Sequence, residues 1–236
     1  MITVITSNQP RHIYLINELA KITDVVAVVQ LFDKPVHTNI ESPVMTEYFE
    51  RMRLVEKVMF PETDIKATKV FEVPTTVGAI IDDFDYKIRN EVNASDHVIV
   101  FGSSWIKNEA YELIKDKAIN LHAGIGYRGA SCNAHAIAEG RKHLVGFTVQ
   151  RLSEGLDCGE PLFYAYADEQ IKEPFALGMS AVINVVDELV EYLMFRDKDT
   201  EAFNSDWWKD KPTDTFTSYK RKSDFTDEIA QKIMKL

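Results

Sequence analysis

Two polar side chains stand near the end of a short apolar run, Ala118-Ile119-Asn120-Leu121-His122-Ala123-Gly124. Residues two apart project from the same face of a strand, so Asn120 and His122 are expected to point the same way. Both come at the carboxyl end of the expected strand, where open α/β sheets bind ligands. An amide donor beside a titratable donor is suited to stabilising a developing oxyanion. The pair therefore forms a candidate acid–base site.

A carboxylate lies further along the chain, where Asp157 stands between Gly155 and Gly159 in a turn-forming context. An Asn, a His and an Asp that converge are able to carry out acid–base chemistry at one reacting centre. Asp157 also has a simpler interpretation, because Asp between glycines commonly forms a turn. Spacing alone leaves both interpretations of this residue open.

Composition restricts the class of protein. The chain has 236 residues and a formal net charge of -10, which disfavours a nonspecific grip on nucleic-acid phosphate. Its two cysteines, Cys132 and Cys158, do not suggest a disulfide framework and are interpreted as packing residues. The start of the chain lacks a signal-peptide pattern, and no apolar run is long enough to span a membrane. We expect a cytoplasmic protein with no membrane partner.

Hydrophobic patterning predicts an α/β protein that opens with a βαβ unit over residues 2–32. The first turn lacks G-x-G-x-x-G, so a dinucleotide cofactor is not indicated. Residues 75–89 alternate apolar and acidic positions, and Asp82, Asp83 and Asp85 are interpreted as a solvated helix face rather than a metal site. Further strands are expected at 69–73, 97–102, 118–124, 144–152 and 162–167, the last two as antiparallel neighbours, and helices from 42, at 132–139 and at 173–195.

Four motifs, taken in order, resemble the core signature of the folate-dependent formyltransferases, which include glycinamide ribonucleotide, methionyl-tRNA and sugar-amine formyltransferases. An ordered set of motifs is far more specific than any one of them. One feature departs from the pattern, because the loop between the His and the Tyr-Arg-Gly turn is shorter here. The motifs are Asn120-Leu121-His122, Tyr127-Arg128-Gly129, Gly146-Phe147-Thr148-Val149 and Gly155-Leu156-Asp157-Cys158-Gly159.

The resemblance implies a Rossmann-like, twisted and mostly parallel sheet with helices on both faces. It implies transfer of a formyl group from N10-formyltetrahydrofolate, as co-substrate, to a primary amine, without a metal. Asn120 and a protonated His122 would hold the tetrahedral oxyanion. Asp157 would orient His122 and help to move a proton from the amine to the leaving N10 nitrogen.

The resemblance also implies two folate-binding loops, whose residues are Phe101, Gly102, Ser104, Trp105 and Ile106 in one and Leu152, Glu154 and Gly155 in the other. Trp105 is either a wall against which the pterin stacks or an ordinary packing residue.

Substrate contacts are assigned to Ser7, Asn8, Tyr127 and Arg128. Ser7 and Asn8 either bind substrate at the start of the first helix or simply cap it. Arg128 either binds an anionic group bidentately or braces its loop through carbonyl oxygens.

The expected organisation is a formyltransferase catalytic domain over 1–196 and a C-terminal extension over 197–236 that packs on or beside it. The chain lacks length for the large C-terminal domain of methionyl-tRNA formyltransferases, and the loop at 6–10 lacks a glycine-rich phosphate loop for glycinamide ribonucleotide. An amino sugar of a nucleotide-linked sugar remains as the expected acceptor. Those two enzymes, a noncatalytic folate-binding module and a formyl-folate hydrolase are the alternatives, and a homodimer is left open.

Overall fold

A computed structural model describes residues 1–32, 42–196 and 218–236. These residues form two compact units. The first unit draws on 1–32, 62–121 and 150–160, and the second on 42–61, 122–149, 161–196 and 218–236. Residues 197–217 lie outside the described part, so the predicted domain boundary at 196 stays a prediction.

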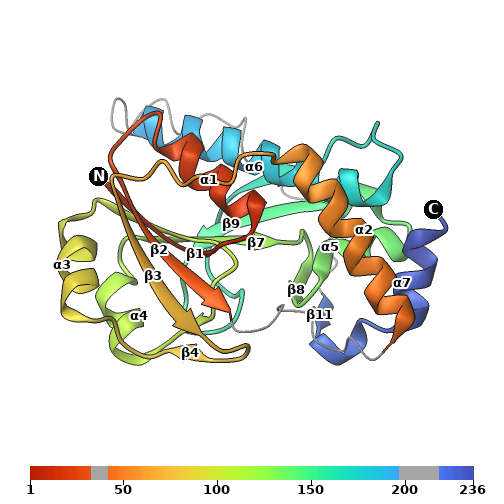
Figure 1. Ribbon diagram of the computed structural model, residues 1–236, viewed down its shortest axis with the longest axis horizontal. Coiled ribbons are helices and arrows are strands. Elements are labelled where there is room, and N and C mark those ends of the chain that lie inside the picture. Colours follow the sequence, from red (N-terminus) through yellow and green to blue (C-terminus); the bar gives the residue numbers. More distant parts are fainter. Residues whose placement is uncertain (33–41, 197–217) are drawn as a thin grey trace. The chain divides into compact units, whose positions relative to one another are not determined.

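The main sheet has seven strands in the order β10-β9-β7-β5-β1-β2-β3 (Figure 1). Its pairs β1–β2, β1–β5, β2–β3 and β5–β7 are parallel, so the expected α/β fold with a mostly parallel sheet is confirmed. The strands are β1 Ile2–Ser7, β2 Val25–Phe32, β3 Lys69–Thr75, β5 His97–Val100, β7 Ala118–Ala123, β9 Gly146–Arg151 and β10 Pro161–Tyr166.

Strands β9 and β10 are the antiparallel neighbours that the alternating pattern predicts. The backbone N–H of Arg151 donates to the carbonyl of Glu160, and that of Ala167 donates to the carbonyl of Val145. Residue numbers therefore rise along one strand as they fall along the other, which is the antiparallel arrangement.

The core of the first unit lies between the strands and two helices, α3 Tyr86–Ala94 and α4 Asn108–Ile114. Ile5 and Val28 pack there against apolar side chains of both helices. Helix α1 Pro10–Leu19 contacts β1 and β2, and it lies on the other side of these strands in Figure 1. Strands buried on both faces explain the continuous β-branched run of β2. A short parallel ladder of β4 Ile80–Ile81 and β6 Trp105–Ile106 completes the unit.

The acidic residues before α3 are not a helix face, and that expectation was wrong. The helix begins only at Tyr86, because the side chain of Asp85 accepts from the backbone N–H groups of Lys87 and Ile88 at 2.8 and 2.9 Å. A carboxylate in this position satisfies backbone donors that have no partner inside the helix. Asp85 therefore starts the helix instead of lying on its surface.

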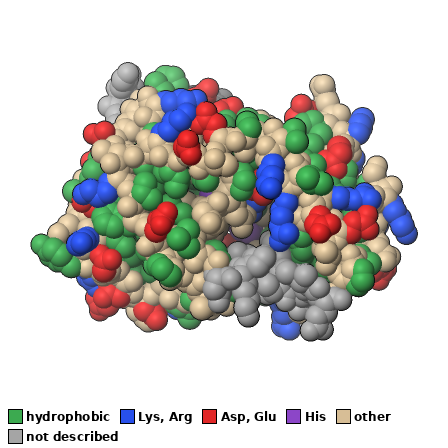
Figure 2. Space-filling view, in the orientation of Figure 1, with side chains coloured by type: hydrophobic (Ala, Val, Ile, Leu, Met, Phe, Trp, Pro, Cys, Tyr) green, Lys and Arg blue, Asp and Glu red, His purple; other side chains and the backbone are tan. Residues whose placement is uncertain are grey.

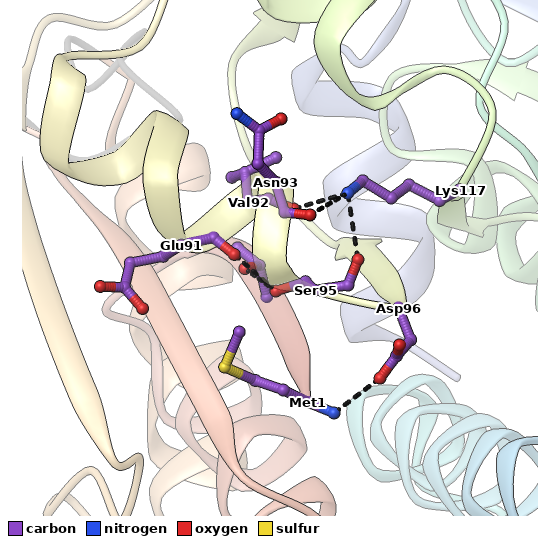
Figure 3. Close-up of polar contacts among 8 residues, drawn as sticks. Met1, Glu91, Val92, Asn93, Ser95, Asp96 and Lys117 are labelled. Atoms are coloured by element: carbon purple, nitrogen blue, oxygen red, sulfur yellow. Dashed lines mark hydrogen bonds and ion pairs between the residues drawn. The ribbon is translucent and has the colours of Figure 1, made fainter.

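Lys117 closes the other end of α3. Its ammonium donates to the carbonyl oxygens of Val92, Ser95 and Asn93 at 2.6, 3.0 and 3.4 Å (Figure 3). The last carbonyls of a helix lack intrahelical donors and carry partial negative charge. A cation from the loop before β7 thus ties the end of α3 to the strand that carries Asn120.

The second unit is built around helices α2 Pro43–Met59 and α6 Pro174–Arg196, which pack together. Ser42 caps α2 by accepting from the backbone N–H of Met45, and Pro43 occupies the first helical position, which agrees with the helix start predicted at residue 42. Helix α7 Asp227–Met234 packs against α2 and against α5 Cys132–Ala138. The ring of Tyr48 in α2 lies 5.0 Å from the rings of both Phe175 and Phe225, forming an aromatic core.

The C-terminal residues also complete a small sheet in this unit. Strand β11 Ser218–Lys220 pairs in parallel with β8 Tyr127–Gly129. This unit also contains two short 3-10 helices, at Lys142–Leu144 and at Lys222–Asp224. On the face drawn in Figure 2, acidic and basic side chains of the described residues are interspersed. No helix in the described ranges is both long and apolar enough to cross a membrane.

Candidate active site

Asn120 and His122 both lie on β7, and each is held by its own surroundings. Asn120 is half-buried and pairs in register with Val100, the last residue of β5. The chain beyond Val100 is the predicted folate loop at 101–106. Asn120 therefore lies at the same carboxyl-terminal end of the parallel strands as the start of that loop, within the first unit.

His122 is 8% exposed, and its Nε2 lies 2.8 Å from the backbone carbonyl oxygen of Tyr127. A carbonyl oxygen accepts hydrogen bonds and never donates, so Nε2 carries the proton in this contact. In a neutral imidazole the lone pair then lies on Nδ1. The Tyr127 carbonyl, just after the short loop that follows β7, thus selects the tautomer of His122.

The loop from Ala123 to Gly126 is packed closely around Gly124. The hydroxyl of Thr148 donates to the carbonyl of Gly124 at 2.6 Å. A Cβ on Gly124 would lie 2.6 Å from the Cβ of Cys132 and 3.2 Å from Nε2 of His122. Thr148 is the threonine of the Gly-x-Thr-Val motif, so this motif braces the loop beside the His122 imidazole.

Tyr127 belongs to the second unit, and it is buried there, with 1% of its surface exposed. Its hydroxyl donates to a carboxylate oxygen of Glu139 at 2.6 Å, and Lys220 donates to the other oxygen at 2.8 Å. Burial, together with the negative charge of Glu139, raises the pKa of the Tyr127 phenol. A buried and hydrogen-bonded phenol favours a positioning role over the substrate contact expected for Tyr127, and that contact stays a prediction. Arg128 is half-buried beside Tyr219 in the β8–β11 ladder, and both interpretations of it remain.

The predicted folate loop at 101–106 is held from several directions in the first unit. Phe101 is buried, and its carbonyl accepts from the hydroxyl of Thr6 at 2.6 Å. Gln30 of β2 accepts from the backbone N–H of Ser104 at 2.7 Å and donates to its hydroxyl at 3.1 Å. Ile106 is buried in the core, whereas Gly102 and Trp105 are exposed. The loop is anchored at Phe101, Ser104 and Ile106, whereas Gly102 and Trp105 are accessible.

His12 supports the same loop, and sequence reasoning did not single it out. Its ring lies 4.4 Å from the ring of Phe101, and its Nδ1 lies 2.8 Å from the hydroxyl of Ser7. Gly102 adopts φ +62°, and a Cβ there would come within 2.3 Å of the His12 ring. Burial, and then the charge of Arg11, lowers the pKa of His12 well below its usual value, so the ring is neutral. The only sequence feature that could have indicated this role is the presence of a histidine, His12, near the start of the first helix.

Ser7 and Asn8 do not cap the first helix, which corrects one of their two interpretations. The N-cap of α1 is Gln9, and its side chain makes no cap hydrogen bond. Ser7 is buried and bonded to His12, whereas Asn8 is exposed. The substrate contacts expected for Ser7 and Asn8 stay predictions.

Trp105 is 41% exposed, and the Lys107 ammonium lies 3.6 Å from the centroid of its ring. Such a position over an indole face is a favourable cation–π contact. A half-exposed ring is not an ordinary core packing residue. Its predicted stacking against the pterin stays a prediction.

Asp157 lies in a turn with φ +51°, which few residues other than glycine adopt and which Asn and Asp tolerate best. The loop starts beside β7, because the N–H of Leu152 donates to the carbonyl of Ala118 at 2.9 Å. A Cβ on Gly159 would meet the backbone of Arg151, so the chain closes tightly there. Leu152 is half-buried, and Glu154 and Gly155 are exposed.

The three residues of the predicted trio are divided between the two units. Asn120 and Asp157 belong to the first, and His122 belongs to the second. Their convergence on one reacting centre stays a prediction. Within the described ranges, no group of three or more His, Cys, Asp and Glu side chains is arranged to hold a metal ion.

Comparison with solved structures identifies the class of fold. A sugar N-formyltransferase from Shewanella sp FDAARGOS_354 matches with a TM-score of 0.56 at 14% identity, over 95% of this chain and 78% of that one. The sugar 3N-formyl transferase WlaRD, solved in the presence of dTDP and 5-N-formyl-THF, has a TM-score of 0.56 at 13% identity, over 98% and 77%. A phosphoribosylglycinamide formyltransferase from Anaplasma phagocytophilum has a TM-score of 0.50 at 14% identity, over 93% and 98%.

The chain therefore has the formyltransferase fold, and the resemblance drawn from the four motifs is confirmed at the level of the fold. Sugar-directed and glycinamide ribonucleotide-directed enzymes share that fold, so it does not distinguish their acceptors. No family model matches the chain, and no curated protein matches it in sequence.

Proposed function

We propose that this protein transfers a formyl group from N10-formyltetrahydrofolate to a primary amine. The observation that carries the proposal is the hydrogen bond from Nε2 of His122 to the Tyr127 carbonyl, at the end of β7 in a formyltransferase fold. A buried imidazole with a defined tautomer is equipped for proton transfer. The order of the four sequence motifs supports the same reaction.

In the proposed reaction, Asn120 donates its amide N–H to the oxyanion that forms when the neutral amine attacks the formyl carbon. His122 in its protonated form supplies a second donor to that oxygen. The new C–N bond forms in this attack, and the bond from the formyl carbon to N10 breaks when the tetrahedral intermediate collapses. The amine loses the proton that N10 gains. Asp157 orients His122 and assists this proton transfer. None of these roles requires a metal.

For the acceptor we propose an amino sugar linked to a nucleotide. The support is the absence of a glycine-rich phosphate loop at residues 6–10, which disfavours glycinamide ribonucleotide as the acceptor. WlaRD was solved with a nucleotide and a formyl-folate, which is the pair of ligands that such a reaction requires. The net charge of -10 disfavours tRNA as the acceptor.

The test is a panel of amines incubated with formyl-folate and the full chain. The panel contains nucleotide-linked amino sugars, glycinamide ribonucleotide and methionyl-tRNA, and the readout is a mass gain of one formyl group. We expect that gain on an amino sugar, with His122→Ala as the matched inactive control. Formate release without any amine would instead show a hydrolase. Folate binding by calorimetry without any turnover would show a noncatalytic binding module.

A further inference from the structure

We infer that Glu139 and Lys220 are positioning residues that set the His122 imidazole through Tyr127. The inference deepens the proposed function and rests on it for its catalytic meaning. In this inference the C-terminal strand β11 helps to orient the catalytic histidine. The contacts that support it all lie within the second unit.

The backbone around Tyr127 is held on both sides by the C-terminal strand. Ser218 donates its N–H to the carbonyl of Gly126, and Ala130 donates its N–H to the carbonyl of Lys220, both at 2.9 Å. A Cβ on Gly129 would lie 2.1 Å from the carbonyl oxygen of Lys220, so the two strands approach more closely than a side chain allows. The peptide that carries the Tyr127 carbonyl therefore lies between two backbone hydrogen bonds that join β8 to β11.

The side chains fasten the same ladder to helix α5. Glu139, the C-cap of α5, accepts from the Tyr127 hydroxyl at 2.6 Å and from the Lys220 ammonium at 2.8 Å. The ammonium also lies 5.6 Å from the centroid of the Tyr127 ring. Burial raises the pKa of Glu139, but the bonds from Lys220 and Tyr127 outweigh it and keep that pKa below its usual value. Glu139 is therefore a carboxylate that joins α5, β8 and β11.

The consequence for His122 follows from the geometry of Tyr127. When the ring and both flanking peptides are fixed, the Tyr127 carbonyl keeps its direction toward Nε2 of His122. The proton stays on Nε2, and proton exchange by His122 is restricted to Nδ1. Releasing the ring would let the carbonyl turn and the imidazole change tautomer. Small misplacements of a catalytic group are known to cost as much as a hundredfold in rate.

The experiment compares Lys220→Met with Lys222→Met, which removes an exposed lysine two residues further along the same segment. Histidine labelled with ¹⁵N reports the His122 tautomer by NMR in the substrate-free protein. We expect Lys220→Met to lose the single Nε2–H tautomer and to lower kcat about tenfold, with KM for formyl-folate unchanged. Lys222→Met is expected to keep both. Lys220→Arg, which retains the cation, should restore the tautomer.

Two further variants keep the inference falsifiable if Lys220→Met does not fold. Tyr127→Phe removes only the hydroxyl, and Glu139→Gln removes only the charge. A folded variant of this set that keeps both the wild-type tautomer and the wild-type kcat would overturn the positioning role. The two proposals fail separately, because the NMR measurement needs no substrate. If the wild type formylates no amine, the proposed function is wrong. The NMR measurement of the His122 tautomer then still tests whether Glu139 and Lys220 position the imidazole.

Discussion

Gln30 and Ser104 are joined by two hydrogen bonds of opposite direction. Oε1 of Gln30 accepts from the backbone N–H of Ser104 at 2.7 Å, and its Nε2 donates to the Ser104 hydroxyl at 3.1 Å. Gln30 is buried in β2, so the amide has little freedom to exchange these partners for water. Strand β2, which lies between β1 and β3 in the sheet, thereby fixes one residue of the predicted folate loop.

Replacing Gln30 by Met keeps the length of the side chain and removes both hydrogen bonds. Because a buried N–H left unsatisfied costs about 1–3 kcal/mol, the loop is expected to move toward water. We expect calorimetry to show roughly tenfold weaker binding of a reduced folate, with kcat at saturating folate near wild type. Gln170→Leu, at an exposed site, is the matched control. Unchanged affinity in Gln30→Met would remove this loop from the folate site.

His122→Ala tests the proposed oxyanion donor. A group that acts mainly in the transition state contributes to kcat and little to ground-state binding. We expect turnover to fall by about a hundredfold or more, with the folate Kd within about twofold of wild type. Stopped assays and calorimetry on the same preparation measure the two quantities. A folded variant with full turnover would exclude His122 from the mechanism.

Asp157→Asn separates a catalytic carboxylate from a turn former. Asn tolerates the left-handed conformation of this residue as well as Asp does, so the melting temperature is expected to stay close to wild type. Asn carries no charge to stabilise an imidazolium, so turnover is expected to fall by roughly two orders of magnitude. The pH–rate profile should also lose one ionisation. Early melting with retained activity would support the turn interpretation instead.

His12 makes the stability of the fold depend on pH. Because burial lowers its pKa in the folded state, the unfolded chain binds more protons below about pH 6.5, and stability falls as the pH falls. The slope from this one group approaches that of one additional proton bound by the unfolded chain. Urea unfolding at several pH values between 5 and 8 should show a shallower slope for His12→Gln. His143→Gln, at an exposed position, should keep the wild-type slope. Equal slopes in all three proteins would contradict the neutral buried state of His12.

Lys117→Met tests the closure of α3. The substitution preserves the length of the side chain and leaves the carbonyls of Val92 and Ser95 without their cationic donor (Figure 3). Hydrogen bonds to charged groups contribute about 1.5–3 kcal/mol, so we expect a loss of unfolding free energy of that order. Chemical denaturation measures it, with Lys115→Met as a comparison because Lys115 pairs only with a neighbouring surface glutamate in the described structure. Equal stability of the two variants would show that water replaces the Lys117 ammonium.

Much of the fold could be read from local patterns. The βαβ opening over residues 2–32, the helix start at 42 and the helix at 132–139 were predicted correctly, because each depends on neighbouring residues. The four ordered motifs also indicated the fold that the solved structures share. Local pattern failed at Asp85, where alternating apolar and acidic residues resemble a helix face and a capping carboxylate delays the helix.

The sequence by itself determined the seven strands of the main sheet, the helices at 132–139 and 173–195 and the order of the candidate catalytic residues. It did not predict the short strands β4, β6, β8 and β11, and Tyr127–Gly129, expected as a turn, is strand β8. Only the tertiary structure revealed what holds them, namely His12 against Gly102, Gln30 on Ser104 and Lys220 on Glu139. The last two pairs are separated by 74 and 81 residues. Contacts between such distant residues leave no periodic trace in the chain, because periodicity reflects the geometry of a single helix or strand. Packing alone brings those partners together, and packing therefore decided which nitrogen of His122 carries the proton.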